Sequence, residues 1–288
     1  MSTAHVPATD DNEGVAGRWI RQSRAFAQRY ARELFRNKAV LFWSVAFPVA
    51  FYLLTITVFV DTSRIPSDVL PYVKAGTAVS YGMFGAVIAS LNSFGQQLAA
   101  DFEADRYMQY RSLPLAPSAD LAGRMVAGVA LSAVAFVAVV VVAVATGAEF
   151  GLRSAVSVPL VLVAFVTFTL VWMALAVVIA TLVEDTRYAS IITISIALGS
   201  YFLTGYNGTA PESFQGPTAV LDWLPHTAAT RQVTQHIVVP PAGLADEAGM
   251  LSVPDPVFGV AQLALYGVLA GFAATLLMRH VVYGGVRA

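Results

Sequence analysis

The sequence predicts an all-α membrane protein with six transmembrane helices. Of its 288 residues 57% are hydrophobic and only 12% are charged, and the mean hydropathy is +0.67. A soluble domain carries roughly 25% charged residues because its surface must stay hydrated. The apolar residues form long blocks rather than the short alternating segments of a membrane β-barrel. Much of the surface is therefore expected to face lipid.

Residues 1–14 are polar and lack the apolar core of a signal peptide, so we expect a disordered cytoplasmic tail. Residues 15–37 predict an amphipathic helix at the membrane surface, with arginines towards the lipid phosphates. The alternative is an ordinary basic flank that aids insertion. The apolar arc of the helical wheel holds Trp19, Phe26, Ala27, Tyr30 and Leu34, and the opposite arc holds Arg18, Arg21, Arg29, Arg32 and Arg36.

The rest of the chain, residues 38–288, reads as one transmembrane domain. A bilayer core about 30 Å thick is crossed by about 20 helical residues, and six stretches meet that requirement. Pro48 predicts a kink in the first of them. The six are about Val40–Val60, Ala75–Gly95, Met125–Thr146, Val156–Val183, Tyr188–Tyr206 and Val257–Met278.

The distribution of basic residues predicts the orientation. In the six-helix topology, 13 of the 17 lysines and arginines fall in segments on the same side as the N-terminus. Because basic residues accumulate on the cytoplasmic side of membrane proteins, both termini are expected to be cytoplasmic.

Several kinds of chemistry find no support in the sequence. The chain has no cysteine, and neither Lys38 nor Lys74 belongs to a phosphate-binding loop, so any ATP must bind to another chain. The histidines have no catalytic zinc spacing; a site shared by His226 and His236 is a minor alternative to surface or packing roles. The spans lack ionisable residues, which disfavours an ion-coupled carrier. Energy is therefore expected to enter from outside the bilayer.

The connection at about residues 97–118 could receive that energy. It begins with a short stretch of mixed charge that contains Asp101, Glu103, Asp105, Arg106 and Arg111, and continues as Leu-Pro-Leu-Ala-Pro-Ser at 113–118. Ser118 is a possible N-cap of the third span. Mixed charge on a short helix suits docking to a soluble partner, although a solvated loop is the alternative.

Taken in order, these features resemble the permease subunits of type-2 ABC exporters. The likeness rests on the amphipathic helix, the stretch 102–106 with the element 113–118, the short turn after the fourth span, and the long outer segment at about 207–250. The sequence departs from the family at Tyr107, near where many relatives have glycine. The resemblance implies that residues 97–118 contact an ATPase and that the turn at 184–187 is a second contact. The coupling residues it implies are Phe102, Glu103, Asp105, Arg106, Pro114, Pro117, Ser118, Glu184, Asp185 and Arg187.

The same resemblance implies that the outer segment forms a re-entrant helical hairpin, to which the glycines and prolines in 205–211 and 221–226 are suited. It also implies a pathway lined by the first, second and fifth spans. The candidate pathway residues are Tyr52, Asn92, Thr193, Ser195 and Tyr201, each of which is open to an ordinary packing role.

The function expected from this likeness is export of an amphipathic substrate across the plasma membrane. Two permeases, identical or paired with a similar chain, would bind two ATPase subunits that hold ATP and magnesium; no nucleic acid is involved. The chain itself would hold no cofactor, no metal and no catalytic residue. The alternatives are a non-transporting membrane scaffold or sensor, then an ion-coupled carrier, and last an intramembrane enzyme.

Overall fold

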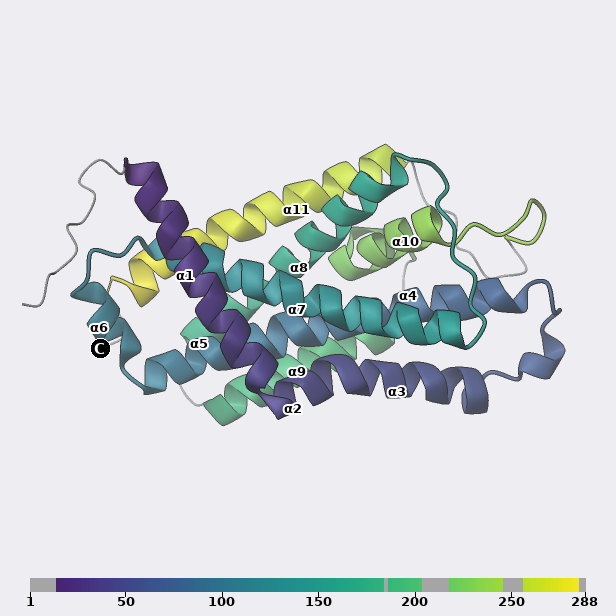
Figure 1. The fold of residues 1–288 in the computed structure, drawn as a ribbon, viewed down its shortest axis with the longest axis horizontal. Helices are drawn as coiled ribbons and strands as arrows, with labels where there is room; N and C mark the ends of the chain where they lie inside the picture. Colours follow the sequence, from purple (N-terminus) through teal and green to yellow (C-terminus); the bar gives the residue numbers. More distant parts are fainter. Residues whose placement is uncertain (1–13, 184–185, 204–217, 246–255, 285–288) are drawn as a thin grey trace, which may run out of the picture.

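The described residues form helices joined by turns and short loops. The computed structural model describes residues 14–183, 186–203, 218–245 and 256–284, and no strand occurs among them. Most helices run along one direction and form an elongated bundle, whereas the first helix lies obliquely across it (Figure 1). The all-helical fold class is therefore confirmed for this part of the chain.

The first helix and the first span meet at a break at Asn37. The Asn37 side chain accepts hydrogen bonds from the backbone N–H groups of Ala39 and Val40, so it caps the second helix. The span changes its hydrogen-bonding pattern just before Pro48, which has no N–H to donate. The elements are α1 (Val15–Arg36), α2 (Lys38–Leu41), the π-helical turn η1 (Phe42–Ala46), α3 (Phe47–Leu54), the π-helical turn η2 (Thr55–Phe59) and the short 3₁₀ helix η3 (Thr62–Arg64).

The remaining helices complete the bundle. A long helical stretch is made of α4 (Leu70–Ile88), the π-helical turn η4 (Ala89–Ser93) and α5 (Phe94–Glu103). The others are α6 (Arg106–Arg111), α7 (Pro117–Ala145), α8 (Ser157–Leu182), α9 (Thr186–Leu203), the 3₁₀ helix η6 (Thr218–Trp223), α10 (Pro225–Ile237), α11 (Pro256–Leu277) and the π-helical turn η7 (Met278–Val282).

Four helical stretches are long and apolar enough to cross a membrane. They are Lys38–Phe59, Pro117–Ala145, Ser157–Leu182 and Val257–Val282, and they correspond to the first, third, fourth and sixth predicted spans. The second and fifth predicted spans fall in α4–α5 and α9, which do not meet the same criterion over the described residues. The six-span topology therefore stays a prediction.

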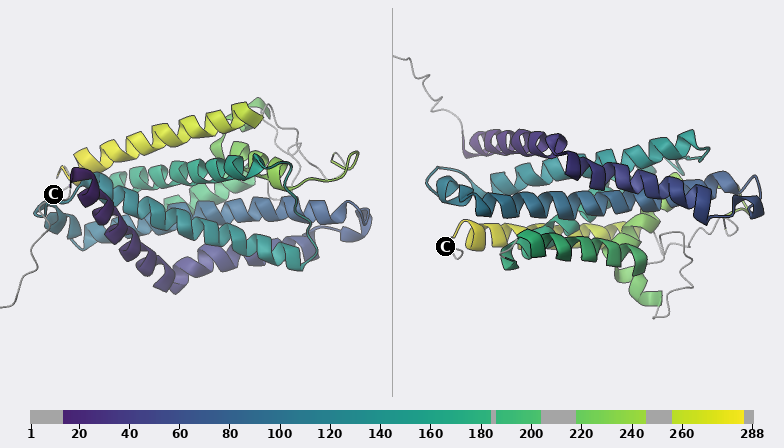
Figure 2. Two further views of the ribbon diagram at one scale, coloured as in Figure 1. Left: turned by 45° about the horizontal axis from the view of Figure 1, so that its top comes forward. Right: turned by 90° about the horizontal axis from the view of Figure 1, so that it is seen from below.

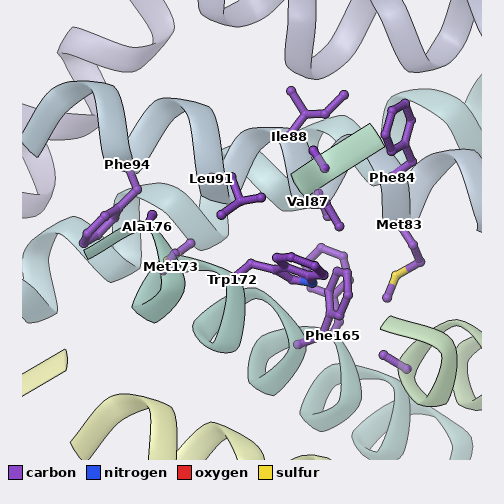
Figure 3. Packing of buried hydrophobic residues seen from close by; sticks show 14 of the residues in the cluster. Met83, Phe84, Val87, Ile88, Leu91, Phe94, Phe165, Trp172, Met173 and Ala176 are labelled. Atoms are coloured by element: carbon purple, nitrogen blue, oxygen red, sulfur yellow. The ribbon is translucent and has the colours of Figure 1, made fainter. Parts of the chain in front are cut away.

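The helix α4 is surrounded by other helices. It packs against α3, α7, α8, α9 and α10, and every residue from Ala78 to Ile88 is buried. A helix that faces other helices can carry small and polar residues, since close packing and hydrogen bonds replace contact with lipid. Figure 3 shows its contact with α8, where Val87 and Leu91 lie close to Trp172 and Met173.

The helix α1 crosses the first half of α7 (Figure 1) and is buried along one side. Phe26, Tyr30 and Leu34 fill this contact. A Cβ atom added at Gly123 of α7 would lie 2.8 Å from the backbone nitrogen of Ala27, so the two helices approach as closely as a glycine permits. These three residues of the apolar arc therefore pack on protein, whereas Trp19 stays exposed.

The helix α7 is longer than a bilayer core requires. α7 has 29 residues, which span about 43 Å and exceed a 30 Å hydrocarbon core by about 13 Å. Its first turns carry the charged residues Asp120 and Arg124, and the helix begins well before Met125, where the third span was predicted to start.

The opposite end of the bundle is tied together by loops. The Lys74 ammonium donates a hydrogen bond to the carbonyl of Thr146 at 2.8 Å. Backbone hydrogen bonds from Gly151 and Arg153 to the carbonyls of Ile237 and His236 join the α7–α8 connection to the end of α10. The predicted re-entrant segment at 207–250 is described only over residues 218–245, which contain η6 and α10. Its re-entrant geometry stays a prediction.

The described ends of the chain lie at the same end of the bundle. Figure 2 shows the start of α1 and the end of α11 on one side. The Tyr30 hydroxyl of α1 and the Tyr283 hydroxyl both donate to Asp120, and the Arg111 guanidinium of α6 donates to the carbonyl of Val282 at 2.7 Å.

We expect Gly123→Ala to destabilise the protein by about 1–3 kcal/mol, because the added methyl group would overpack the crossing of α1 and α7. The matched control is Gly76→Ala in α4, where no atom lies within 4 Å of the added Cβ. Alanine there should be neutral or stabilising by up to about 1 kcal/mol. Thermal unfolding in detergent measures both, and equal stability of the two variants would contradict the close crossing.

Candidate functional site

A buried ionic cluster joins α5 to α7. The Arg124 guanidinium is fully buried and pairs with Asp101 of α5 and, through Nε at 3.2 Å, with Asp120 of its own helix. The exposed fractions of the three side chains are 0%, 1% and 0%, respectively. A buried charge is tolerated only when opposite charges and hydrogen bonds compensate for its lost hydration. The two carboxylates supply this compensation.

Three tyrosine hydroxyls converge on Asp120. Tyr30 donates at 2.9 Å, Tyr107 at 3.1 Å and Tyr283 at 3.3 Å. Burial is the main cause that raises the pKa of each of these phenols, so they remain protonated donors at neutral pH. With Nε of Arg124, the carboxylate of Asp120 accepts from four donors. Its lone pairs are thus satisfied without water.

A second ring of charges surrounds Asp101. Arg106 of α6 pairs with Asp101, and Arg29 of α1 approaches the same carboxylate at 3.6 Å. Glu33 of α1 accepts from Nε of Arg29 at 3.0 Å and lies 3.9 Å from Arg106. We call this set the Asp101–Asp120 network; its members are Arg29, Tyr30, Glu33, Asp101, Arg106, Tyr107, Asp120, Arg124 and Tyr283.

The network connects elements that are far apart in the sequence. It joins α1, α5, α6, α7 and the residue that follows η7. The guanidinium of Arg124 also lies 3.9 Å from the centre of the Tyr30 ring, which adds a cation–π contact between α7 and α1. These elements are therefore held as one block.

The residues predicted to couple to an ATPase lie around this block. Arg106 belongs to the network, and Phe102 stacks on Tyr107 with ring centroids 5.1 Å apart. Glu103 and Asp105 are exposed at the turn between α5 and α6. Asp105 has a left-handed backbone with φ of 49°, a conformation that aspartate and asparagine tolerate better than most residues. This turn presents its carboxylates to solvent.

The proline-containing element is bound by α1. The Gln22 side chain donates to the carbonyl of Pro114 at 3.0 Å and accepts from the N–H of Ala116 at 3.0 Å. Nε1 of Trp19 donates to the hydroxyl of Ser118 at 3.0 Å. The prediction that Ser118 is the N-cap of α7 is wrong. The helix already begins at Pro117, and the hydroxyl of Ser118 accepts a hydrogen bond from Trp19.

The second predicted contact falls largely outside the described residues. Glu184 and Asp185 are not described, and Arg187 is described only as part of the α9 helix. Their coupling role stays a prediction.

The structure describes the side chains of four of the five predicted pathway residues. Tyr52 is buried and its hydroxyl bonds Thr146 at 3.0 Å, while the Thr193 hydroxyl bonds the carbonyl of Ala189 in its own helix. Ser195 is exposed on α9. The side chain of Asn92 lies outside the described residues.

Tyr201, the fifth predicted pathway residue, lines a small cavity. Its ring stacks on Phe84 with centroids 4.3 Å apart. His226, at the start of α10, contributes an Nε2 atom that has no hydrogen-bond partner among the described residues. The cavity lies between α4, α8, α9 and α10, and its lining is Ser80, Met83, Phe84, Val87, Phe168, Ser200, Tyr201, His226 and Thr230.

The two outer histidines do not form a joint metal site. They lie at opposite ends of α10, and the ten residues between them correspond to about 15 Å. Nδ1 of His236 instead bonds the buried Ser157 hydroxyl at 3.1 Å. No group of three or more metal-binding side chains occurs in the part of the chain that the structure describes.

Sequence reasoning missed the Asp101–Asp120 network. Arg124 counted as a basic flank of the third span, and Asp120 was not singled out. One available signal was the spacing of Asp120 and Arg124, which places opposite charges on one face of a helix. The tyrosines gave no such signal, because Tyr30 and Tyr283 are more than 90 residues from Arg124 along the chain.

The model of a protein family, described as ABC-2 type transporter, matches residues 21–226. The match covers more than half of the chain and runs from α1 to the first turn of α10. No curated protein matches the sequence.

We expect Arg124→Leu to lower the free energy of unfolding by about 3–5 kcal/mol, because two carboxylates would stay buried without their shared counter-ion. The matched control is Arg64→Leu, which breaks the exposed pair with Asp61 and should cost at most about 1 kcal/mol. Thermal unfolding in detergent compares them. Similar losses in both variants would mean that the network does not hold the fold.

The stability of the protein should fall as pH falls, because α10 carries one buried and one half-buried histidine. Burial lowers the pKa of His226 to about 4, and it also lowers the pKa of His236. Between pH 6.5, the ordinary histidine value, and pH 4, the unfolded chain binds protons that the folded chain does not. Each unit of pH lost in this window should therefore cost about 1.4 kcal/mol for His226.

The unfolding temperature measured from pH 7.5 to pH 4.5 tests this expectation. His226→Gln should flatten the dependence, whereas His280→Gln should retain it because His280 is exposed at the other end of the bundle. If His226→Gln keeps the full dependence on pH, the buried histidine is not its source.

Proposed function

Because the chain belongs to the ABC-2 type transporter family, we propose that it is the permease subunit of an ATP-driven exporter. The family and the apolar helices make the chain a multi-pass membrane protein and a transport component. Permeases of this family work with ATPase subunits, and this chain has no phosphate-binding loop of its own. ATP and magnesium would bind to two ATPase subunits in the cytoplasm.

The Asp101–Asp120 network is the observation that carries the coupling proposal. A push on the tip between α5 and α6 would reach α7 and α1 through buried ion pairs and hydrogen bonds. A flexible, solvated loop would absorb such a push, whereas a buried network of ion pairs and hydrogen bonds resists deformation. Glu103 and Asp105 are exposed at this tip, and their charge suits a basic surface on the ATPase.

We propose that the pathway forms where two permeases meet, with identical or similar partner chains. The helix α9 supports this interface. Its apolar stretch, Ile191–Tyr201, is short, and Ile191 and Ile194 within that stretch are exposed. Ser195 is exposed among them, so it remains a pathway candidate. The packing of Tyr52 and Thr193 favours a structural role for those two side chains.

We propose that both termini lie in the cytoplasm and that the protein resides in the plasma membrane. The predominance of arginine and lysine on the N-terminal side supports it. The proximity of α1 to the end of α11 is in keeping with an even number of membrane crossings. An amphipathic substrate would then move outward.

The direct test is co-purification from membranes of the chain with the ATPase encoded beside its gene. Wild type should retain the ATPase and hydrolyse ATP. Glu103→Lys combined with Asp105→Asn should lower retention by at least tenfold, since it reverses or removes the charges at the tip while asparagine tolerates the left-handed backbone of Asp105.

The control is Asp68→Lys, which changes an exposed carboxylate at the opposite end of the bundle and should retain the ATPase. If the tip variant also retains it, the docking site is wrong although the complex is real. If the folded wild type binds no ATPase, the alternative of a non-transporting membrane scaffold takes precedence.

A further inference from the structure

The outward side of α1 carries basic residues that have no acidic partner among the residues that the structure describes. Arg24, Arg32 and Arg36 are exposed, and Lys38 follows at the start of α2. Within residues 14–183 and the other described ranges, none of these four forms an ion pair. The nearest acidic residue in α1, Glu33, is engaged by Arg29. This side of α1 therefore presents positive charge to its surroundings.

Three large apolar residues in the middle and second half of α1 are not available to lipid. Phe26, Tyr30 and Leu34 are at most 8% exposed, because they pack on α7. An amphipathic helix usually attaches to a bilayer by burying its apolar face among the acyl chains. Here these three residues pack on protein, whereas Val15, Ile20 and Phe35 of α1 are exposed beside the basic residues, so α1 presents charges together with isolated apolar side chains.

The position of the first span determines the depth at which these charges lie relative to the bilayer. The span begins at Lys38, only one residue after α1 ends. Arg36 and Lys38 must therefore lie at the headgroup level of the bilayer. Just beyond them Phe42 and Trp43 are 54% and 48% exposed, and aromatic side chains of this kind favour the boundary between headgroups and acyl chains.

We propose that Arg32, Arg36 and Lys38, which we call the junction site, bind the headgroups of anionic phospholipids in the cytoplasmic leaflet. Guanidinium groups bind phosphate oxygens through paired hydrogen bonds, and lysine adds a compact positive charge. The four-residue spacing of Arg32 and Arg36 places both side chains on one side of α1. The exposed rings of Phe42 and Trp43 lie beside the acyl chains of the same lipid.

The bound lipid would also position the coupling element. α1 holds that element through Gln22 at Pro114 and Ala116, and through Trp19 at Ser118. A lipid that restrains α1 at the membrane surface thus restrains the segment on which the ATPase acts. This second step rests on the function proposed above, whereas lipid binding at the junction site does not require an ATPase.

Binding is tested on the purified full chain in detergent, to which phosphatidylglycerol or phosphatidylcholine is added in mixed micelles. Phosphatidylglycerol should raise the unfolding temperature, and high salt should reduce the shift. Inorganic phosphate at equal concentration should produce no shift. Arg32→Gln combined with Arg36→Gln should weaken the dependence on phosphatidylglycerol by about 25-fold, since each cation near an anionic surface contributes about fivefold.

The matched control is Arg18→Gln combined with Arg24→Gln, which removes the same charge from the part of α1 farther from the span. This control should bind phosphatidylglycerol nearly as wild type does. Equal loss in both double variants would overturn a defined junction site, because general attraction by the basic helix would explain it. An equal effect of phosphatidylcholine would overturn anionic selectivity, and an equal effect of inorganic phosphate would point to a soluble anion.

The effect of bound lipid on the coupling element is tested on the complex with the ATPase in lipid nanodiscs. Phosphatidylglycerol should raise the ATP hydrolysis rate of the wild-type complex severalfold and leave that of the junction variant unchanged. If lipid binds but the rate does not respond, the link from α1 to the coupling element is wrong. Failure to form any complex would contradict the proposed exporter function and leave the binding result intact.

Discussion

Arg124 can remain buried only because Asp101 and Asp120 share its charge, and much of the structure at that end of the bundle follows from this requirement. Both carboxylates need further donors once the arginine is placed between them. α1 supplies Tyr30 and Arg29, α6 supplies Arg106 and Tyr107, and the end of the last helix supplies Tyr283. Five separate segments are thereby brought to one centre, and removing any one leaves a polar group unsatisfied.

The same requirement explains how α1 is placed. A helix that supplies both a tyrosine and an arginine to a buried centre must lie tightly against α7, and Gly123 makes that approach possible. Phe26, Tyr30 and Leu34 are then covered by α7. What remains for the surroundings is a side rich in arginine, with isolated exposed apolar residues such as Ile20 and Phe35.

The sequence was sufficient for features that depend on one continuous segment. Four long apolar runs identified four spans, because few structures other than a membrane helix can accommodate them. The amphipathic period of α1 predicted a helix but could not show whether its apolar side meets lipid or protein. α4 reads as a weaker span because its neighbours cover it. The network was not predicted because Asp101, Asp120 and Tyr283 come together only in the folded chain. No local sequence pattern indicates such a contact.

A rigid centre at one end of a bundle is useful for transport only if bending occurs next to it. Three of the chain segments that pass from the network into the bundle contain a π-helical turn there: η1 after α2, η4 before α5, and η7 before Tyr283. Sharp bends in helices concentrate at such turns, because their hydrogen-bonding pattern is already interrupted. α7 is the exception, since it runs without interruption from Asp120 to Ala145. The arrangement therefore combines one straight helix, which can transmit displacement along its length, with three helices that can bend around it.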